Sequence, residues 1–277
     1  MSNVAGKVVV ITGGGSGFGR LVSEKTAALG AKVVASDINA TSVGETVDSI
    51  RNAGGEAIAV AADVTDLGQM RGLADRAVEA FGAIDVMVNN AGVMPLAFYA
   101  DHGVAGDAWA ACIDINIKGV LFGTMAVHDQ MIAQGRGHVI NLSSIYGNQP
   151  VAGAAVYGAS KAAVNFLSDA LRQESQGKIK VTTIRPTGVP GTALGDGVIN
   201  PMALAGILGT GMEDFMQKVG AMASGDAPDG LSSPDNIEYF ALDADLLADQ
   251  IVYAIDQPWG VSISDLTVRA SGDSYVI

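Results

Sequence analysis

The sequence predicts an α/β fold in which a parallel, doubly wound sheet of seven strands is flanked by helices. Short apolar runs rich in β-branched residues alternate with amphipathic stretches along most of the 277-residue chain, and this alternation is typical of a parallel sheet. The connections are brief, with no Pro/Ser-rich linker and no repeat of fixed period. Residues 1–277 are therefore expected to form a single domain.

Charge and cysteine content narrow the range of partners and locations. The formal net charge of −13 argues against a nucleic-acid partner, because affinity for phosphate backbones comes mainly from Lys and Arg. Cys112 is the only cysteine, and the sequence has no signal-like start, so we expect a cytoplasmic protein without an intrachain disulfide. No uninterrupted apolar run approaches the roughly 18 residues of a membrane span, and three scattered histidines predict no catalytic metal site.

A glycine-rich turn joins the first predicted strand to the first helix. The apolar run at residues 7–11 leads into Thr12-Gly-Gly-Gly-Ser-Gly-Phe-Gly19, and an amphipathic stretch follows at residues 20–29. Backbone amides at a helix N-terminus bind anions, and residues without a Cβ let a pyrophosphate approach closely. We expect the dinucleotide contacts in this turn to come from Gly13, Ser16, Gly17, Phe18 and Gly19, with a plain tight turn as the alternative.

The second predicted strand, residues 32–35, ends at Ser36-Asp37-Ile38. A carboxylate at this place, 18 residues beyond Gly19, can accept hydrogen bonds from the ribose diol of an adenosine and would repel a 2′-phosphate. Asp37 and Ile38 are therefore expected to contact NAD.

The next elements alternate in the same way. Ser42 and Glu45 resemble a capping box that opens a helix ending near residue 53. A strand is expected at residues 57–61, and a helix at residues 67–81, which Asp63 could cap. A fourth strand, residues 84–88, precedes Asn89-Asn90-Ala91-Gly92.

Two further stretches precede the fifth strand. The apolar loop at residues 94–99 either lines a pocket or caps the core. One long helix is expected at residues 109–130, with Asn116 inside it, although Asn suits a helix interior poorly.

The fifth strand, residues 138–142, leads to the segment with the clearest chemistry. Tyr157 and Lys161 stand four apart on a helix, about 6 Å along its axis, so they share one face. A cation beside a phenol lowers the phenol pKa from about 10 and allows proton exchange near neutral pH. Ser144, in the preceding turn, can hydrogen-bond the same substrate oxygen. The alternative is an ordinary helix pair.

Together these motifs resemble the short-chain dehydrogenase/reductase superfamily in its single-domain form. The pattern Thr12-Gly13-x-x-x-Gly17-x-Gly19, and Ser144 followed by Tyr157 and Lys161 at intervals of thirteen and four, carry the resemblance, which covers nearly the whole chain. It implies a Rossmann-like fold with Tyr157 as acid/base. Lys161 would lower the Tyr157 pKa and bind the nicotinamide ribose, and Asn116 would support a proton relay through a helix kink and a bound water. Asn116 as a merely buried, satisfied residue is the alternative.

The resemblance also implies further cofactor contacts. Asp63 and Val64 would contact adenine, and the segment Asn90, Ala91 and Gly92 would flank the cofactor. Relatives that use NADP often carry Arg or Lys at the places of Ser16 and Ile38, which favours NAD here.

One segment departs from the family pattern. The sixth strand, residues 178–184, ends at Arg185-Pro186-Thr187-Gly188-Val189, with an apparent extra residue before Thr192. Pro186, Gly188 and Val189 are expected near the nicotinamide carboxamide. Thr192 is the candidate hydroxyl, and Thr187 remains possible.

Residues 193–243 lack a strand pattern and contain several methionines among glycines. The resemblance implies a helical substrate lid here, and flexible methionines adapt to irregular apolar shapes, so a hydrophobic substrate is expected, with cyclic ones among the candidates. A helix that only packs on the body is the alternative. A helix at residues 243–255 and a strand at residues 263–270 complete the fold, and the apolar end of the tail, residues 271–277, suggests a subunit contact because relatives are commonly tetramers.

The sequence thus predicts an NAD-dependent oxidoreductase that interconverts a hydrophobic secondary alcohol and its ketone. A non-catalytic dinucleotide-sensing or interaction protein is a second hypothesis, whose expected mark is a broken set of catalytic residues. Enoyl reduction is a third, but relatives with that activity usually space the Tyr and Lys more widely.

Overall fold

A computed structural model describes residues 2–190 and 192–277 of the chain. Seven parallel strands form one sheet in the order β3-β2-β1-β4-β5-β6-β7, which confirms the predicted topology. Their bounds are β1 Val8–Thr12, β2 Lys32–Asp37, β3 Glu56–Ala61, β4 Val86–Asn89, β5 Gly137–Leu142, β6 Ile179–Pro186 and β7 Asp265–Val268. The strand order reverses between β1 and β4, and in such sheets ligands bind at this switch point, outside the carboxyl ends of the strands.

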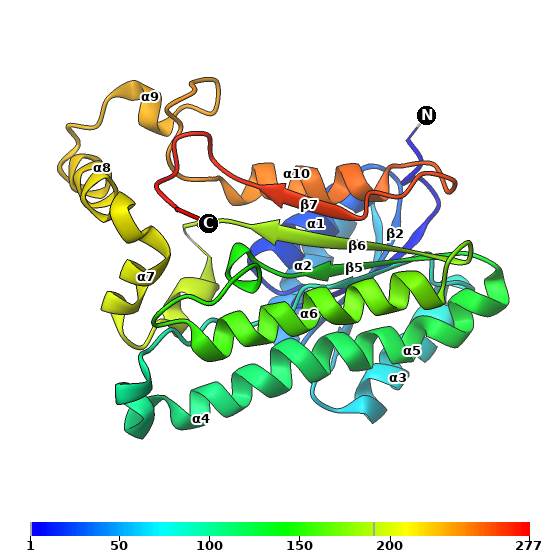
Figure 1. The fold of residues 1–277 in the computed structure, drawn as a ribbon. Helices are drawn as coiled ribbons and strands as arrows, with labels where there is room; N and C mark the ends of the chain where they lie inside the picture. The colour runs from blue at the N-terminus through cyan, green and yellow to red at the C-terminus, as the bar shows by residue number, and fades with distance from the viewer. Residues whose placement is uncertain (1, 191) are drawn as a thin grey trace.

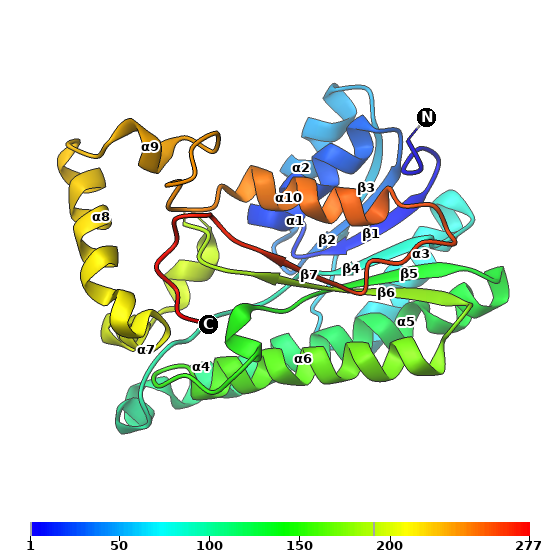
Figure 2. The same cartoon turned by 45° about the horizontal axis from the view of Figure 1, so that its top comes forward.

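Helices cover both faces of the sheet (Figures 1 and 2). One face packs against α1 Gly17–Ala28, α2 Ala40–Asn52 and α10 Ala244–Ile255, and the other against α3 Leu67–Phe81, α5 Gly119–Gln134 and α6 Ala155–Glu174. Side chains alternate along β1, so that Val9 and Ile11 join the first core and Val8 and Val10 the second. Burial on both faces explains why the strands read as continuous apolar runs.

The predicted capping box of the second helix is wrong, and Asp63 does not take the alternative role of capping the third helix. Asn39, and not Ser42, caps α2: its Oδ1 accepts hydrogen bonds from the amides of Thr41 (3.1 Å) and Ser42 (3.2 Å), so the helix begins two residues earlier than the proposed capping box. Asp66 caps α3, whereas Asp63 accepts from the Thr65 amide at 2.8 Å. At the start of both helices, the side chain of another residue, Asn39 or Asp66, accepts the hydrogen bonds of the unpaired first-turn amides.

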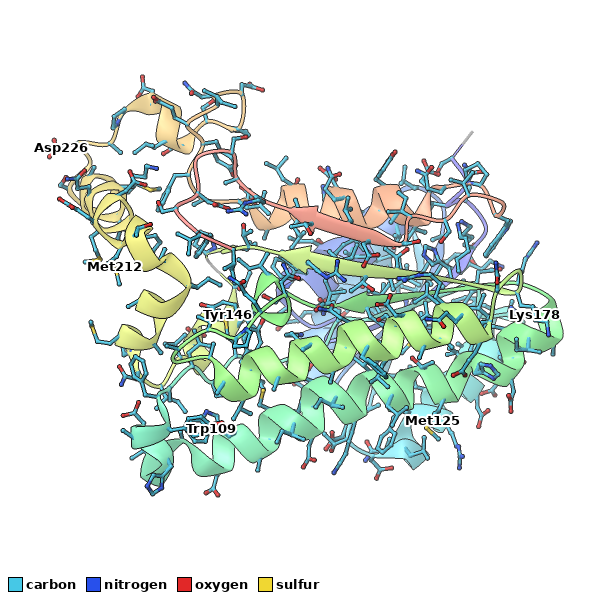
Figure 3. All side chains as sticks on the ribbon, in the orientation of Figure 1. Trp109, Met125, Tyr146, Lys178, Met212 and Asp226 are labelled. Carbon is cyan, nitrogen blue, oxygen red and sulfur yellow. The ribbon has the colours of Figure 1, made fainter. Side chains whose placement is uncertain are left out.

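The long helix extends beyond the predicted residues 109–130. A continuous helical stretch, Tyr99–Gln134, contains α4 His102–Ile113, a π-helical turn at Asp114–Lys118 and α5. By length and composition alone it could cross a membrane, a test that core helices also pass, and a third of its most apolar window is buried. The stretch packs against α3 and α6, and Met125 lies on its outer side (Figure 3).

The segment predicted as a lid is helical and lies beyond the carboxyl ends of the strands (Figure 1). Its α-helices are α7 Ala205–Leu208, α8 Met212–Ser224 and α9 Asp229–Ser232. The C-terminal tail, residues 271–277, packs on this segment within the same chain: Ser274 Oγ donates to Asp214 Oδ2 at 2.6 Å, and Lys218 Nζ donates to the Gly272 carbonyl at 2.9 Å. Its aromatic residue Tyr275 and its last residue Ile277 pack against the chain's own apolar cluster.

Candidate active site

A cavity of about 1140 Å³ opens at the carboxyl ends of the strands, between the sheet and the lid. It brings together nearly all of the residues predicted for the site. Its lining includes Gly13, Ser16, Gly17, Phe18, Asp37, Ile38, Asp63, Val64, Asn90, Ala91, Gly92, Ser144, Tyr157, Lys161, Pro186, Gly188, Val189 and Thr192. Gly19 and Asn116 are not part of the lining.

The glycine-rich turn follows β1 and lines the middle of the cavity, between the ends of β2 and β5. Gly13 has φ +65° and lies so close to Asn90 that a Cβ would stand 2.8 Å from its Nδ2. Asn90 Nδ2 donates to the carbonyls of Thr12 (2.9 Å) and Gly13 (3.2 Å) and so holds the turn. A Cβ on Gly19 would stand 2.1 Å from the Gly13 carbonyl oxygen. The absence of a side chain at Gly19 therefore lets α1 pack closely against the turn. Gly17, also with positive φ, has open space where a Cβ would stand.

Asp37 lies at the end of β2 beside this turn. Its Oδ2 accepts a hydrogen bond from the Gly15 amide at 3.0 Å, and its Oδ1 accepts from the Asn39 amide at 3.0 Å. Ile38 follows with an exposed side chain at the cavity rim. The carboxylate is therefore fixed where the adenosine half of a dinucleotide extending from the turn would lie.

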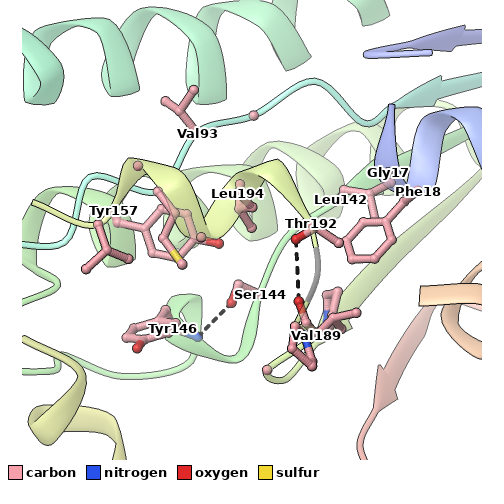
Figure 4. A pocket seen from close by; sticks show the side chains of 18 of the residues that line it. Gly17, Phe18, Val93, Leu142, Ser144, Tyr146, Tyr157, Val189, Thr192 and Leu194 are labelled. Atoms are coloured by element: carbon pink, nitrogen blue, oxygen red, sulfur yellow. Dashed lines mark hydrogen bonds between the residues drawn. The ribbon is translucent and has the colours of Figure 1, made fainter. Parts of the chain in front are cut away.

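Ser144, Tyr157 and Lys161 meet at the end of the cavity away from Asp37 (Figure 4). All three are buried, with Tyr157 only 2% exposed. Lys161 Nζ donates to the Leu142 carbonyl at 2.8 Å and lies 5.8 Å from the centroid of the Tyr157 ring. Ser143 Oγ donates to the Lys161 carbonyl at 3.1 Å, so this serine ties β5 to α6. Ser144 Oγ accepts from the Tyr146 amide at 3.3 Å.

Burial shifts the pKa values of Tyr157 and Lys161. It raises the pKa of Tyr157, while hydrogen bonding with Ser144 acts in the opposite direction. Burial also lowers the pKa of Lys161 to about 8. The predicted lowering of the Tyr157 pKa is therefore wrong for the polypeptide by itself, because removal of the phenolate from water outweighs the hydrogen bond.

Asn116 lies in the π-helical turn and is fully buried. Its Oδ1 accepts from the Val93 amide at 2.9 Å, and its Nδ2 donates to the Val93 carbonyl (2.9 Å) and to Ser160 Oγ (3.0 Å). Ser160 Oγ in turn donates to the Tyr157 carbonyl at 2.7 Å. The amide thus links the loop after β4 to the helix that carries Tyr157, and the irregular helix predicted around it takes the form of a π turn.

The two threonines after β6 differ in their hydrogen bonding. Thr192 Oγ1 donates to the Val189 carbonyl at 3.4 Å (Figure 4). Thr187 Oγ1 is buried against the cavity and has no hydrogen-bond partner among the described residues. A buried hydroxyl without a partner fits a site that receives a polar group such as a carboxamide.

Apolar side chains form the remaining wall. They come from the loop after β4 and from the lid, and include Met94, Leu204, Phe215, Val219, Met222 and Phe240. Sequence reasoning expected apolar lining from both segments but missed Tyr146 and Tyr275, which also line the cavity. Tyr146 stands two residues after Ser144, and this short interval is the only local signal for it.

The residues present fit a nicotinamide dinucleotide. The cavity runs from the fixed Asp37 carboxylate at the end of β2, past the glycine-rich turn with open space at Gly17, to a buried phenol, an ammonium group and the Thr187 hydroxyl, which has no partner among the described residues. This order of groups matches adenosine ribose, pyrophosphate and nicotinamide in turn.

Comparisons with known proteins agree with this geometry. A family model described as short chain dehydrogenase matches residues 7–200. An uncharacterized oxidoreductase of Listeria monocytogenes is 34% identical over 275 residues, covering 98% of this chain and 99% of the relative. A 2,5-dichloro-2,5-cyclohexadiene-1,4-diol dehydrogenase of Sphingobium indicum is 36% identical over 189 residues, 68% of this chain and 75% of the relative.

Solved structures are similar over nearly the whole chain. A 7α-hydroxysteroid dehydrogenase complexed with NADH and 7-oxo glycochenodeoxycholic acid has a TM-score of 0.77 at 25% identity, covering 97% of this chain and 94% of that one. A metagenomic short-chain oxidoreductase in complex with NADP has a TM-score of 0.72 at 28% identity, covering 97% and 99%. The similar proteins thus include users of both dinucleotides.

Proposed function

Because the chain belongs to the short-chain dehydrogenase/reductase superfamily, we propose that it is an NAD-dependent oxidoreductase interconverting a hydrophobic secondary alcohol and its ketone. The observation that carries the proposal is the meeting of Ser144, Tyr157 and Lys161 in one largely apolar cavity with the glycine-rich turn. All four predicted catalytic positions are intact in the sequence, which weighs against a non-catalytic dinucleotide-binding protein.

The polypeptide contributes positioning and proton transfer. In alcohol oxidation, the Tyr157 phenol releases its own proton towards Lys161 while its oxygen takes the proton of the substrate hydroxyl, and Ser144 holds the substrate oxygen through a hydrogen bond. A nicotinamide dinucleotide, which the glycine-rich turn, Asp37 and Lys161 would hold, would supply the hydride chemistry. Lys161, with its pKa near 8, is partly able to release a proton at neutral pH and so can pass protons onward from Tyr157. In ketone reduction, the proton moves in the reverse direction.

Preference for NAD over NADP rests on Asp37. Its carboxylate is fixed by two backbone amides, and a 2′-phosphate beside it would meet like charge. Neither Ser16 nor Ile38 offers a cation to offset that repulsion.

The lining of the cavity supports a hydrophobic substrate. Met94, Leu204, Phe215, Val219 and Phe240 line the same cavity as the catalytic residues, and most binding energy for a ligand there would come from removing apolar surface from water.

The test is the appearance of NADH absorbance with purified protein, NAD and a panel of aliphatic, alicyclic, terpenoid, aromatic and steroid alcohols, repeated with NADP. Turnover with NAD preferred is the expected result. Tight NADH binding without turnover of any alcohol would favour the dinucleotide-sensing alternative.

We also propose that the chain forms a cytoplasmic homo-oligomer such as a tetramer, in which the helices α4, α5 and α6 pack against a second copy of the chain. The helices α4, α5 and α6 expose Ile113, Leu121, Met125 and Phe166, the last 77% exposed, and exposed apolar patches mark association surfaces. The net charge of −13 disfavours a nucleic acid or an anionic membrane as the partner. Light scattering coupled to gel filtration, with Phe166→Glu as the disrupting variant, tests this.

A further inference from the structure

Resting on the alcohol oxidation proposed above, we propose that Tyr146 and Tyr275 form a polar subsite that binds a second oxygen atom of the substrate. The preferred substrate would then be a diol or a hydroxyketone. The second oxygen takes no part in the hydride transfer and serves only to orient the molecule.

Tyr146 supplies the first observation. It lies in the short 3-10 turn Ile145–Gly147, directly after Ser144, and its ring stands edge-on to the Tyr157 ring with 5.4 Å between centroids. The residue is 7% exposed, and its hydroxyl has no hydrogen-bond partner in the described part of the chain. An unpaired buried hydroxyl destabilises a protein unless a partner arrives, and Tyr146 is one of the residues that line the cavity.

The orientation of Tyr146 separates it from the reacting centre. In Figure 4 its ring lies beside Tyr157, with the hydroxyl on the side away from Ser144. Tyr146 therefore cannot share the role of Ser144 at the reacting oxygen. A hydroxyl in this place instead meets a part of the substrate beyond the reacting carbon.

Tyr275 supplies the second observation and comes from the other end of the chain. Its phenol reaches over Gly188, where a Cβ would stand 1.8 Å from the phenol oxygen. The backbone around it is fixed, since the Tyr275 carbonyl accepts from Arg269 Nη2 at 2.9 Å and the Tyr275 amide donates to Asp273 Oδ1 at 3.3 Å. The side chain lines the same cavity, so a glycine and an anchored tail together place a phenol inside it.

The two phenols belong to one apolar cluster: Tyr146 is among its buried residues, and Tyr275 packs against it. Burial raises the pKa of Tyr146, and Tyr275 is the next contributor in the same direction. Burial raises the pKa of Tyr275 to about 12. Both groups are therefore neutral at neutral pH, and each can donate one hydrogen bond and accept another, which suits a hydroxyl or a carbonyl oxygen.

The surroundings make this subsite selective. The cluster that contains both phenols also includes Met94 from the loop after β4 and Leu204 and Phe215 from the lid, none of which hydrogen-bonds strongly. A substrate without a second oxygen would leave the Tyr146 hydroxyl unpaired, and sites built to pair a hydroxyl discriminate strongly against analogues that lack it.

The experiment compares kcat/KM with NAD for cyclohexanol and for the 1,2-, 1,3- and 1,4-cyclohexanediols. We expect wild type to prefer at least one diol over cyclohexanol by about tenfold or more, and Tyr146→Phe and Tyr275→Phe each to lower that ratio about tenfold. Tyr253→Phe, at an exposed tyrosine on α10, is the matched control and should keep the ratio. Because both rates come from one preparation, partial unfolding of a variant cancels in the ratio.

Each remaining outcome is decisive. If diols and cyclohexanol react equally and the ratio is unchanged in both Phe variants, the subsite is refuted while the proposed reaction stands. If no alcohol reacts with NAD or NADP, the proposed function and the subsite are refuted together.

Discussion

The Asp37 carboxylate accepts a hydrogen bond from the Gly15 amide, with 3.0 Å between Oδ2 and the nitrogen. This contact joins the carboxyl end of β2 to the glycine-rich turn after β1. Asp37 therefore has a structural role in the turn as well as the proposed role in selecting the dinucleotide.

Asp37→Ala should weaken NAD binding by about tenfold or more, because hydrogen bonds to charged groups contribute about 1.5–3 kcal/mol. It should also relax the discrimination against NADP, since the repelling charge is removed. The ratio of kcat/KM for the two dinucleotides measures this, with Asp48→Ala on the exposed side of α2 as the control. An unchanged ratio in Asp37→Ala would show that the ribose contact lies elsewhere.

Tyr157→Phe should lower kcat by about 10²–10⁴-fold, the usual contribution of a general acid/base, while NADH still binds. The substitution removes only the phenol oxygen from a buried ring. Stopped-flow turnover and NADH fluorescence titration measure the two properties. Tyr99→Phe, at an exposed residue, controls for the chemistry of the change, and a Tyr157→Phe enzyme as active as wild type would contradict the mechanism.

His138 should make the protein less stable as the pH falls. It is buried on β5, its Nε2 lies 2.8 Å from Thr182 Oγ1, and burial, with Lys180 and Lys7 nearby, holds its pKa well below the ordinary 6.5. Below about pH 6.5 the unfolded chain binds a proton here and the folded chain does not. The free energy of unfolding should therefore fall by up to about 1.4 kcal/mol per pH unit from this residue.

Urea unfolding between about pH 5 and 7 measures the slope. His138→Gln should flatten it, whereas His128→Gln, at an exposed histidine, should not. Equal slopes in wild type and His138→Gln would mean that His138 is protonated in the folded protein.

Asp214→Ala should loosen the lid. Asp214 Oδ2 accepts from Ser274 Oγ at 2.6 Å and from Lys218 Nζ at 2.8 Å, which ties α8 to the tail. Because the group is exposed, we expect a modest effect: faster amide hydrogen exchange in α8 and a rise in the KM for the alcohol of up to about fivefold. Glu213→Ala, one residue away, is the control. Exchange in α8 as slow as in wild type would show that apolar packing alone holds the lid.

Much of the fold was predictable because its signals are local. The central strands β1, β4 and β5 are buried throughout, and the intervals between Ser144, Tyr157 and Lys161 fix a turn and a helical face. These residues do meet in the structure, at one end of one cavity. The glycine-rich turn was equally predictable. Gly13 and Gly17 adopt positive φ, a conformation that favours glycine, so the glycines mark the turn in the sequence.

The wrong or missed predictions fall into two kinds. In some places several neighbouring residues could have played the same role, and in others the contact joins residues that are far apart in the sequence. Asn39 and Ser42 are both suitable caps, and the choice depends on where the strand before them ends. The pKa of Tyr157 depends on burial, which spacing does not reveal. Tyr146 and Tyr275 are 129 positions apart in the sequence, and only the folded tail brings them to the same cavity.

The π-helical turn Asp114–Lys118 also restricts how this chain can be recombined with its relatives. Removing one residue from the turn would restore regular α-helical hydrogen bonding and remove the wide turn that holds Asn116. Asn116 would then lose its register with Val93 and Ser160. Chimeras should therefore cross over before Tyr99 or after Gln134, and an exchange within the helix must keep the number of residues in the turn.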